Sequence, residues 1–102
     1  MTENIEIGDL VIPKFSICGD GASRYLNKDL KDDFGSKIEP DLILTNKLVK
    51  CSTDILEGKL VKLHRAINYS IDTVFAQFPH IDYIKSLGAE VIEMETYAFF
   101  KA

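Results

Sequence analysis

Two carboxylates flank a methionine near the end of the sequence, at Glu93, Met94 and Glu95. An ionised carboxylate can accept two hydrogen bonds from a vicinal diol, and methionine packs well against a ring, so this run could hold a sugar. The segment 89–94 is short, apolar and β-branched, which predicts a strand. Glu95 would then lie at a strand-to-helix junction, the edge of an open α/β sheet where ligands bind. The simpler alternative is that Glu95 only caps the helix and Glu93 is a solvated strand end.

A second polar pair, Asp72 and Thr73, follows an apolar run and precedes Val74 and Phe75. This pair could form the polar lip of an aromatic-walled pocket. A plain turn after a strand explains the same residues. The segment 19–23 superficially resembles a phosphate-binding loop, but it lacks the lysine of a P-loop and the spacing of a dinucleotide motif.

The histidines and cysteines predict neither a metal site nor a cofactor. His64 and His80 stand at no metal-ligand spacing from carboxylates or cysteines, and Cys18 and Cys51 are too few for a disulfide framework.

Composition bounds the class of protein. The 102 residues are 46% hydrophobic and 27% charged, which predicts one folded domain. The formal charge of -4 argues against nucleic acid as a partner, because phosphates attract basic surfaces. No apolar run approaches the roughly 18 residues of a membrane span, and the polar N-terminus is not a signal peptide. These features predict a cytoplasmic protein that binds neither nucleic acid nor membrane.

Hydrophobic periodicity predicts an α/β fold with a mixed, partly parallel sheet and flanking helices. The predicted elements, in chain order, are a strand in 9–18, a helix in 40–57, one or two strands in 59–71, a helix in 79–87, a strand in 89–94 and a helix from residue 95 onward. The segment 22–37 is predicted to be a loop with at most one short helical turn. Pro13 predicts either an edge or a bulge in the first strand.

The first predicted helix is amphipathic. Leu44, Leu48, Cys51 and Ile55 recur at helical spacing, which predicts that this stripe packs against the rest of the fold.

Three stretches, taken together and in this order, resemble the nucleoside phosphorylase and nucleosidase superfamily, which includes purine nucleoside phosphorylases, uridine phosphorylases and methylthioadenosine nucleosidases. They are residues 5–26 (IEIGDLVIPKFSICGDGASRYL), 70–75 (SIDTVF) and 86–96 (SLGAEVIEMET). The resemblance covers the central to C-terminal part of such a domain. It implies part of a phosphorylase-type α/β/α sandwich, so that residues 1–102 form a single partial domain that resembles its middle segment.

The same resemblance implies a chemistry, since these enzymes cleave the N-glycosidic bond of ribonucleosides with phosphate or water as acceptor. Met94 would line the ribose, Glu95 would bind its 2′ and 3′ hydroxyls, and Glu93 would lie beside them. Phe75 or Val74 would lie against the base. The activity would be that of a pentosyltransferase or an N-glycosyl hydrolase. A nucleoside, phosphate in the complete enzyme, and further copies of the chain in a homo-oligomer would be its partners.

The sequence departs from the family pattern in ways that also carry expectations. It lacks the Gly-rich turn and arginines that hold phosphate, and the later Asp that protonates the departing purine, so no catalytic residue is expected in this chain. The Gln and Arg that read a pyrimidine are not apparent after Phe75, which favours a purine, with His80 at most a substitute. We expect the isolated chain to bind nucleosides weakly and to turn none over. The alternative is a non-catalytic remnant that acts as a nucleoside-binding or interaction module.

Overall fold

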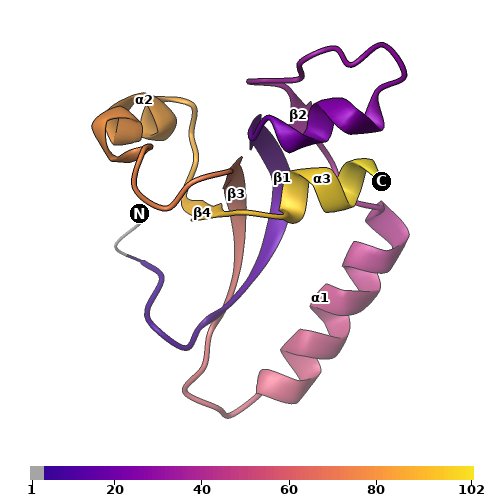
Figure 1. Cartoon of the computed structure of the whole chain (residues 1–102). Helices are drawn as coiled ribbons and strands as arrows, with labels where there is room; N and C mark the ends of the chain where they lie inside the picture. The colour runs from indigo at the N-terminus through magenta and orange to yellow at the C-terminus, as the bar shows by residue number, and fades with distance from the viewer. Residues whose placement is uncertain (1–3) are drawn as a thin grey trace.

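Four strands form one sheet in the structure, a computed structural model that describes residues 4–102 (Figure 1). The strands are β1 (Leu10–Gly19), β2 (Lys37–Ile38), β3 (Leu63–Ile71) and β4 (Val91–Glu93), in the order β2-β1-β3-β4. Strands β1, β3 and β4 are parallel, and β2 is antiparallel to β1. The predicted α/β class with a mixed, mostly parallel sheet is therefore confirmed.

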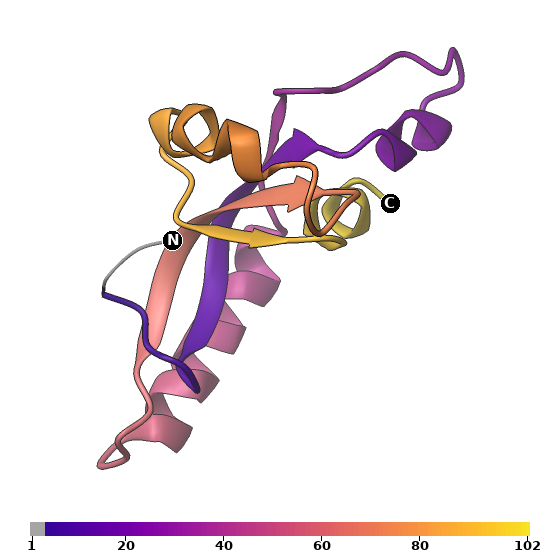
Figure 2. The same ribbon diagram turned by 60° about the vertical axis from the view of Figure 1, so that its left-hand side comes forward.

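Helices lie on both faces of this sheet. The α-helices are α1 (Leu42–Leu56), α2 (Ile81–Ser86) and α3 (Thr96–Lys101). Two short 3-10 turns, η1 (Ala22–Leu26) and η2 (Phe78–His80), precede β2 and α2. Helix α2 covers one face of the sheet, and α1 and α3 lie on the other (Figure 2).

The two faces of the parallel strands differ in chemistry. Under α2 the face is apolar, and its buried cluster consists of Ile17, Tyr69, Ile71, Ile84 and Ala89. Under α3 the alternate positions of the same strands carry small or polar side chains, which are Ser16, Cys18, Asn68 and Ser70, and all four are buried. Because successive side chains of a strand point to opposite faces, this alternation separates an apolar layer from a polar one.

The interpretation of Pro13 as a bulge is confirmed. The register of β1 against β3 shifts between Pro13 and Phe15, so one extra residue is inserted there. Strand β2 pairs with β1 only at Ser16 and Ile17, and Pro13 therefore needs no ladder partner on that side.

Local signals mark the start of α1 and the end of α2. Asp41 caps α1, where its Oδ1 accepts a hydrogen bond from Leu44 N at 2.7 Å, and Pro40 precedes it. Gly88 follows α2 with φ +87°, a conformation that glycine adopts without strain. The segment 59–71 contains one strand, which begins at Leu63. The predicted loop 22–37 contains η1 and, at its end, the start of the short strand β2.

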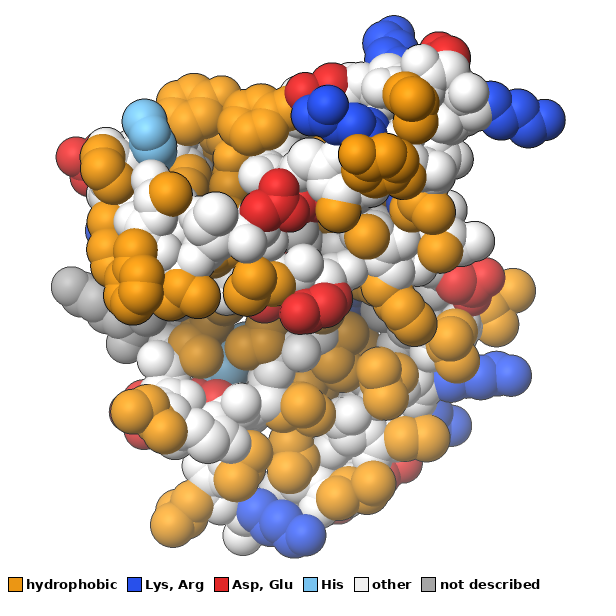
Figure 3. All heavy atoms as spheres, viewed as in Figure 1, with side chains coloured by type: hydrophobic (Ala, Val, Ile, Leu, Met, Phe, Trp, Pro, Cys, Tyr) orange, Lys and Arg blue, Asp and Glu red, His pale blue; other side chains and the backbone are white. Residues whose placement is uncertain are grey.

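The predicted packing of α1 is wrong. Leu44, Leu48 and Ile55 are exposed, Leu48 to 51%, and the buried residues of this helix are Thr45 and Ser52. Apolar side chains therefore reach the surface along α1 (Figure 3). Periodicity identifies which residues share a face of the helix, but the face that meets the sheet is set by how the connections place the helix.

Candidate functional site

The loops that follow β1, β3 and β4 meet at one edge of the sheet. All three strands are parallel, so their carboxyl ends point the same way. This edge is where ligands bind in open α/β sheets. It carries the segments 20–24, 72–77 and 94–95, and Glu93 is the last residue of β4 beside it. The residues that the family pattern assigns to the sugar and the base therefore all lie at or next to this edge.

The Glu93 side chain is fully engaged in hydrogen bonds. Its Oε1 accepts from Asn68 Nδ2 at 2.6 Å and from Ser70 Oγ at 2.5 Å. Its Oε2 accepts from the backbone N–H groups of Glu95 and Thr96, each at 2.7 Å. Glu93, rather than Glu95, therefore caps the start of α3. The alternative in which Glu93 is a solvated strand end does not describe this side chain.

These hydrogen bonds also set the protonation state of Glu93. Burial alone raises the pKa of the carboxyl group, but the hydroxyl, amide and backbone donors stabilise the ionised form more strongly, and the net pKa is lowered. Glu93 is thus a carboxylate at neutral pH.

A buried network of hydrogen bonds connects Glu93 to β3 and β1. Asn68 Nδ2 also donates to Ser16 Oγ at 2.8 Å, and the Ser16 and Ser70 hydroxyls lie 3.1 Å apart. Tyr97 N donates to Ser70 Oγ at 2.9 Å. Asn68 Oδ1 has no hydrogen-bond partner among residues 4–102, so the amide orientation is set by its Nδ2 group. The sequence contains a signal for this network, since the polar residues at 68 and 70 alternate with Ile67, Tyr69 and Ile71 in the second half of β3, but it does not indicate their partner.

Glu95 and Met94 form the turn between β4 and α3. Glu95 is the N-cap residue of α3, yet its side chain makes no capping hydrogen bond in the described chain. Both side chains are exposed, Met94 to 42%. In the part of the chain that the structure describes, the Glu95 carboxylate has no capping partner, and it stands at the strand-to-helix junction, as the sequence predicts.

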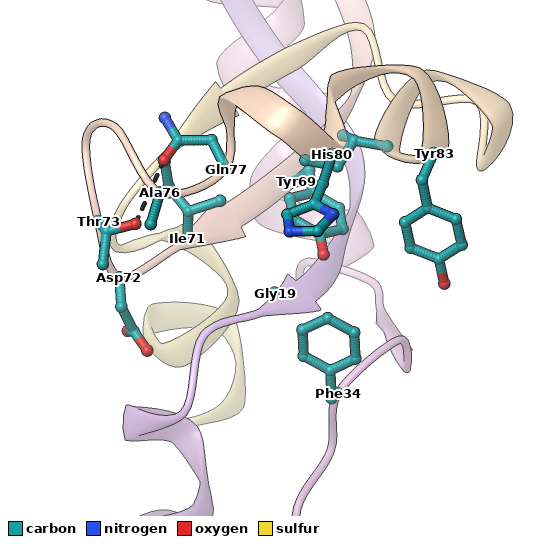
Figure 4. A pocket seen from close by; sticks show the side chains of 11 residues that line it. Gly19, Phe34, Tyr69, Ile71, Asp72, Thr73, Ala76, Gln77, His80 and Tyr83 are labelled. Atoms are coloured by element: carbon teal, nitrogen blue, oxygen red, sulfur yellow. Dashed lines mark hydrogen bonds between the residues drawn. The ribbon is translucent and has the colours of Figure 1, made fainter.

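A cavity of about 440 Å³ opens at the same edge, beneath α2. Its volume is in the range of roughly 300–1,000 Å³ that small-molecule sites occupy. The rings of Phe34, Tyr69, His80 and Tyr83 gather at one end, and Asp72 and Thr73 lie at the other (Figure 4). This arrangement matches the interpretation of Asp72 and Thr73 as the polar lip of an aromatic-walled pocket.

Hydrogen bonds hold the two loops beside this cavity. Asp72 Oδ2 accepts from Gly21 N at 2.6 Å, which ties the loop after β3 to the loop after β1. In the latter loop the buried Asp20 accepts from the backbone N–H of Ser23 at 2.8 Å and from its hydroxyl at 2.7 Å. Asp72 thus both lines the cavity and ties the two neighbouring loops together.

The five residues proposed for substrate contact do not line the aromatic-walled pocket. Glu93, Met94, Glu95, Val74 and Phe75 are all absent from the lining of the aromatic-walled pocket. Val74 and Phe75 are exposed, and the Phe75 ring packs edge-on against Phe78 with centroids 5.8 Å apart. Their contact with a substrate stays a prediction.

Sequence reasoning missed three of the rings that line the pocket, which are those of Phe34, Tyr69 and Tyr83. Phe34 comes from the predicted loop, and Tyr83 is an exposed residue of α2. Neither belongs to a motif, so only the fold brings them together.

Other chemistries find little support in the described chain. Residues 4–102 contain no cluster of three or more His, Cys, Asp or Glu side chains that could hold a metal ion. Burial raises the pKa of the Cys18 thiol to about 12, which makes it a poor nucleophile. None of the described helices is both long and apolar enough to span a bilayer.

Comparison with known families identifies the superfamily of the chain. The family model of the phosphorylase superfamily matches residues 1–102. The chain therefore belongs to the phosphorylase superfamily, whose chemistry is nucleoside phosphorylase-like and consists of glycosyl transfer or glycosyl hydrolysis. A search of curated proteins returned no match.

Proposed function

We propose that this chain supplies the ribose-binding part of a site that cleaves the N-glycosidic bond of purine ribonucleosides. In this proposal the Glu95 carboxylate accepts hydrogen bonds from the 2′ and 3′ hydroxyls, and Met94 packs against the sugar ring. The observation that carries it is the free Glu95 side chain at the carboxyl edge of the sheet, made available because Glu93 performs the capping.

The charge of Glu95 suits the reaction. The sugar gains positive charge as the bond to the base breaks, and a carboxylate held against the diol both orients the sugar and stabilises that charge. The acceptor, phosphate or water, is not determined by the residues of this edge.

The aromatic-walled pocket gives the base a place to bind. A purine can stack on aromatic rings in an offset or edge-on arrangement, and Phe34, Tyr69 and Tyr83 provide such rings. His80 lines the same pocket and supplies a ring nitrogen that can hydrogen-bond to the base, in the absence of the family's Gln and Arg. Val74 and Phe75, in the loop beside it, remain the residues that the family pattern assigns to the base.

These 102 residues orient a nucleoside and do not turn it over. The sequence lacks the family's phosphate-holding turn and the acid that protonates the base. Orientation of the sugar without those groups lowers the barrier too little for measurable turnover.

Nucleoside titration tests this function directly. Adenosine is titrated into ¹⁵N-labelled protein, and binding is followed by the amide chemical shifts of residues near the sheet edge. We expect Glu95→Gln to bind adenosine about tenfold more weakly, because a hydrogen bond to a charged group contributes roughly 1.5–3 kcal/mol. Glu57→Gln changes an exposed acid at the C-terminal end of α1, and this variant should bind like the wild type.

Equal affinity in the wild type and Glu95→Gln would refute the role of Glu95. Incubation of the wild-type chain with adenosine and phosphate, followed by chromatography for free adenine, checks the second part of the proposal. We expect no adenine, and its release would contradict the assignment of the chain as a binding part alone.

A further inference from the structure

The turn that carries Glu95 is flanked by very short elements. Strand β4 has three residues and α3 has six. A helix of this length has almost no stability of its own, and a three-residue strand contributes few ladder bonds. The position of the Glu95 side chain must therefore be fixed by other contacts.

Three consecutive backbone N–H groups of this turn are fixed by side chains. Glu95 N and Thr96 N donate to Glu93 Oε2, both at 2.7 Å, and Tyr97 N donates to Ser70 Oγ at 2.9 Å. Orphan N–H groups at a helix start normally bond to a cap residue or to water. Here they are fastened instead to a side chain of β4 and a side chain of β3.

The anchor on the sheet side is buried. Glu93 Oε1 accepts from Asn68 and Ser70, and Asn68 also reaches Ser16 on β1. Asn68, Ser70 and Ser16 are fully buried. The carboxylate therefore links the turn to the two central strands, through groups that have little room to move.

The four hydrogen bonds also occupy all the acceptor positions of the Glu93 carboxylate. Two oxygens offer about four acceptor positions, and Glu93 uses each oxygen twice. No position is left for a sugar hydroxyl unless one of these bonds breaks. Glu95, two residues further on, keeps its acceptor positions free of capping bonds.

We propose that Glu93 is a positioning residue, which holds the Met94–Glu95 turn in place and thereby gives the site its preference for ribose over 2′-deoxyribose. The inference rests on the proposed function, in which Glu95 binds the diol. Glu93 itself does not touch the sugar. A group that only stabilised the fold would alter the affinity for both sugars alike, so the ratio of the two affinities separates the two roles.

The test compares adenosine with 2′-deoxyadenosine in NMR titrations of the 102-residue protein. We expect the wild type to bind adenosine several-fold to about tenfold more tightly, and Glu93→Gln to reduce this ratio to about two or less. Glutamine keeps the size of the side chain, but its NH₂ group accepts no hydrogen bond, so either the pair Asn68 and Ser70 or the turn loses its acceptor. The amides of Glu95 and Thr96 should also exchange faster with solvent in this variant.

Two further variants complete the design. Ser70→Ala removes a donor to Glu93 and the acceptor for Tyr97 N, and it should lower the ratio even if Glu93→Gln does not fold. Asp20→Asn is the matched control, because Asp20 is also a buried acid that holds a backbone N–H and a hydroxyl, but in the loop after β1. It should leave the ratio at its wild-type value.

The outcomes distinguish the inference from the proposed function. A wild-type ratio in folded Glu93→Gln and Ser70→Ala overturns the positioning role and leaves the role of Glu95 intact. A ratio lowered as much in Asp20→Asn also overturns it, since any loosening of the edge would then suffice. A wild-type protein that does not distinguish the two nucleosides overturns the proposed function, and this inference falls with it.

Discussion

The two ends of the sheet use the same chemical device in different surroundings. At the amino end, Asp9 accepts hydrogen bonds from Lys62 N at 3.0 Å, from Glu6 N at 3.1 Å and from the His64 ring at 2.8 Å. At the carboxyl end, Glu93 accepts from two backbone N–H groups and two buried side chains. Each carboxylate fastens a loop to a strand.

The two acids differ in the burial of the groups that donate hydrogen bonds to them. The donors to Asp9 come from exposed loops and a half-buried histidine, whereas those to Glu93 include the fully buried Asn68 and Ser70. An acid at a strand end is therefore not evidence of a binding site by itself. The informative acid is the one that the fold leaves without a capping role, and at the carboxyl end this is Glu95.

The largest effect should come from breaking the carboxyl-end network. Asn68→Ala removes one donor to Glu93 and one to Ser16 and opens a small void, so we expect the free energy of unfolding to fall by about 2–3 kcal/mol. Urea denaturation followed by circular dichroism measures this. Asn46→Ala, the same substitution at an exposed position of α1, should change stability by less than about 0.5 kcal/mol. Similar losses in both variants would contradict the importance of the buried network.

A smaller and pH-dependent effect is expected at the amino end. The N–H groups of Lys62 and Glu6, and then the His64 ring, lower the pKa of Asp9 from 3.8 to about 2. A lowered pKa means that the ionised group stabilises the fold above its ordinary pKa and that this contribution is lost as the pH falls.

Asp9→Asn should therefore be less stable than the wild type at neutral pH, and the gap should close between pH 3.8 and about 2. Urea midpoints of the two proteins at neutral pH and across this acidic window provide the measurement. A gap that stays constant with pH would show that the charge of Asp9 does not hold this loop.

The smallest effect should come from the exposed stripe of α1, which has no counterpart at either end of the sheet. Leu48→Ala removes an exposed side chain and introduces a residue that favours helix, so the two contributions nearly cancel. We expect a change within about 0.5 kcal/mol in the same urea experiment. A loss of about 2 kcal/mol or more would mean that Leu48 is buried in solution.

The sequence predicts local features of the fold well. The predicted helices in 40–57 and 79–87 contain α1 and α2, and the bulge at Pro13 follows from the missing N–H of proline. Each of these depends on the conformation of a few neighbouring residues. The α/β order follows likewise from periodicity within single segments.

Features that depend on distant residues are not predictable in this way. Nothing local decides which of Glu93 and Glu95 caps α3, because the decision depends on Asn68 and Ser70, which lie 25 and 23 residues from Glu93 in the chain. For the same reason the exposure of Leu44 on α1 and the meeting of Phe34 with Tyr83 in the pocket could not be predicted. Their positions follow from how the elements pack.

The close packing at the end of β1 restricts which residue can stand at position 19. At Gly19 a side-chain carbon would overlap the Tyr69 ring and come within 2.6 Å of the Ser70 carbonyl oxygen. Even the methyl group of alanine at residue 19 is therefore compatible with the fold only if the Tyr69 ring moves and the strand shifts slightly. We expect residues 19 and 69 to change together in any variant that keeps this pocket. A residue smaller than tyrosine should stand at position 69 whenever alanine replaces Gly19.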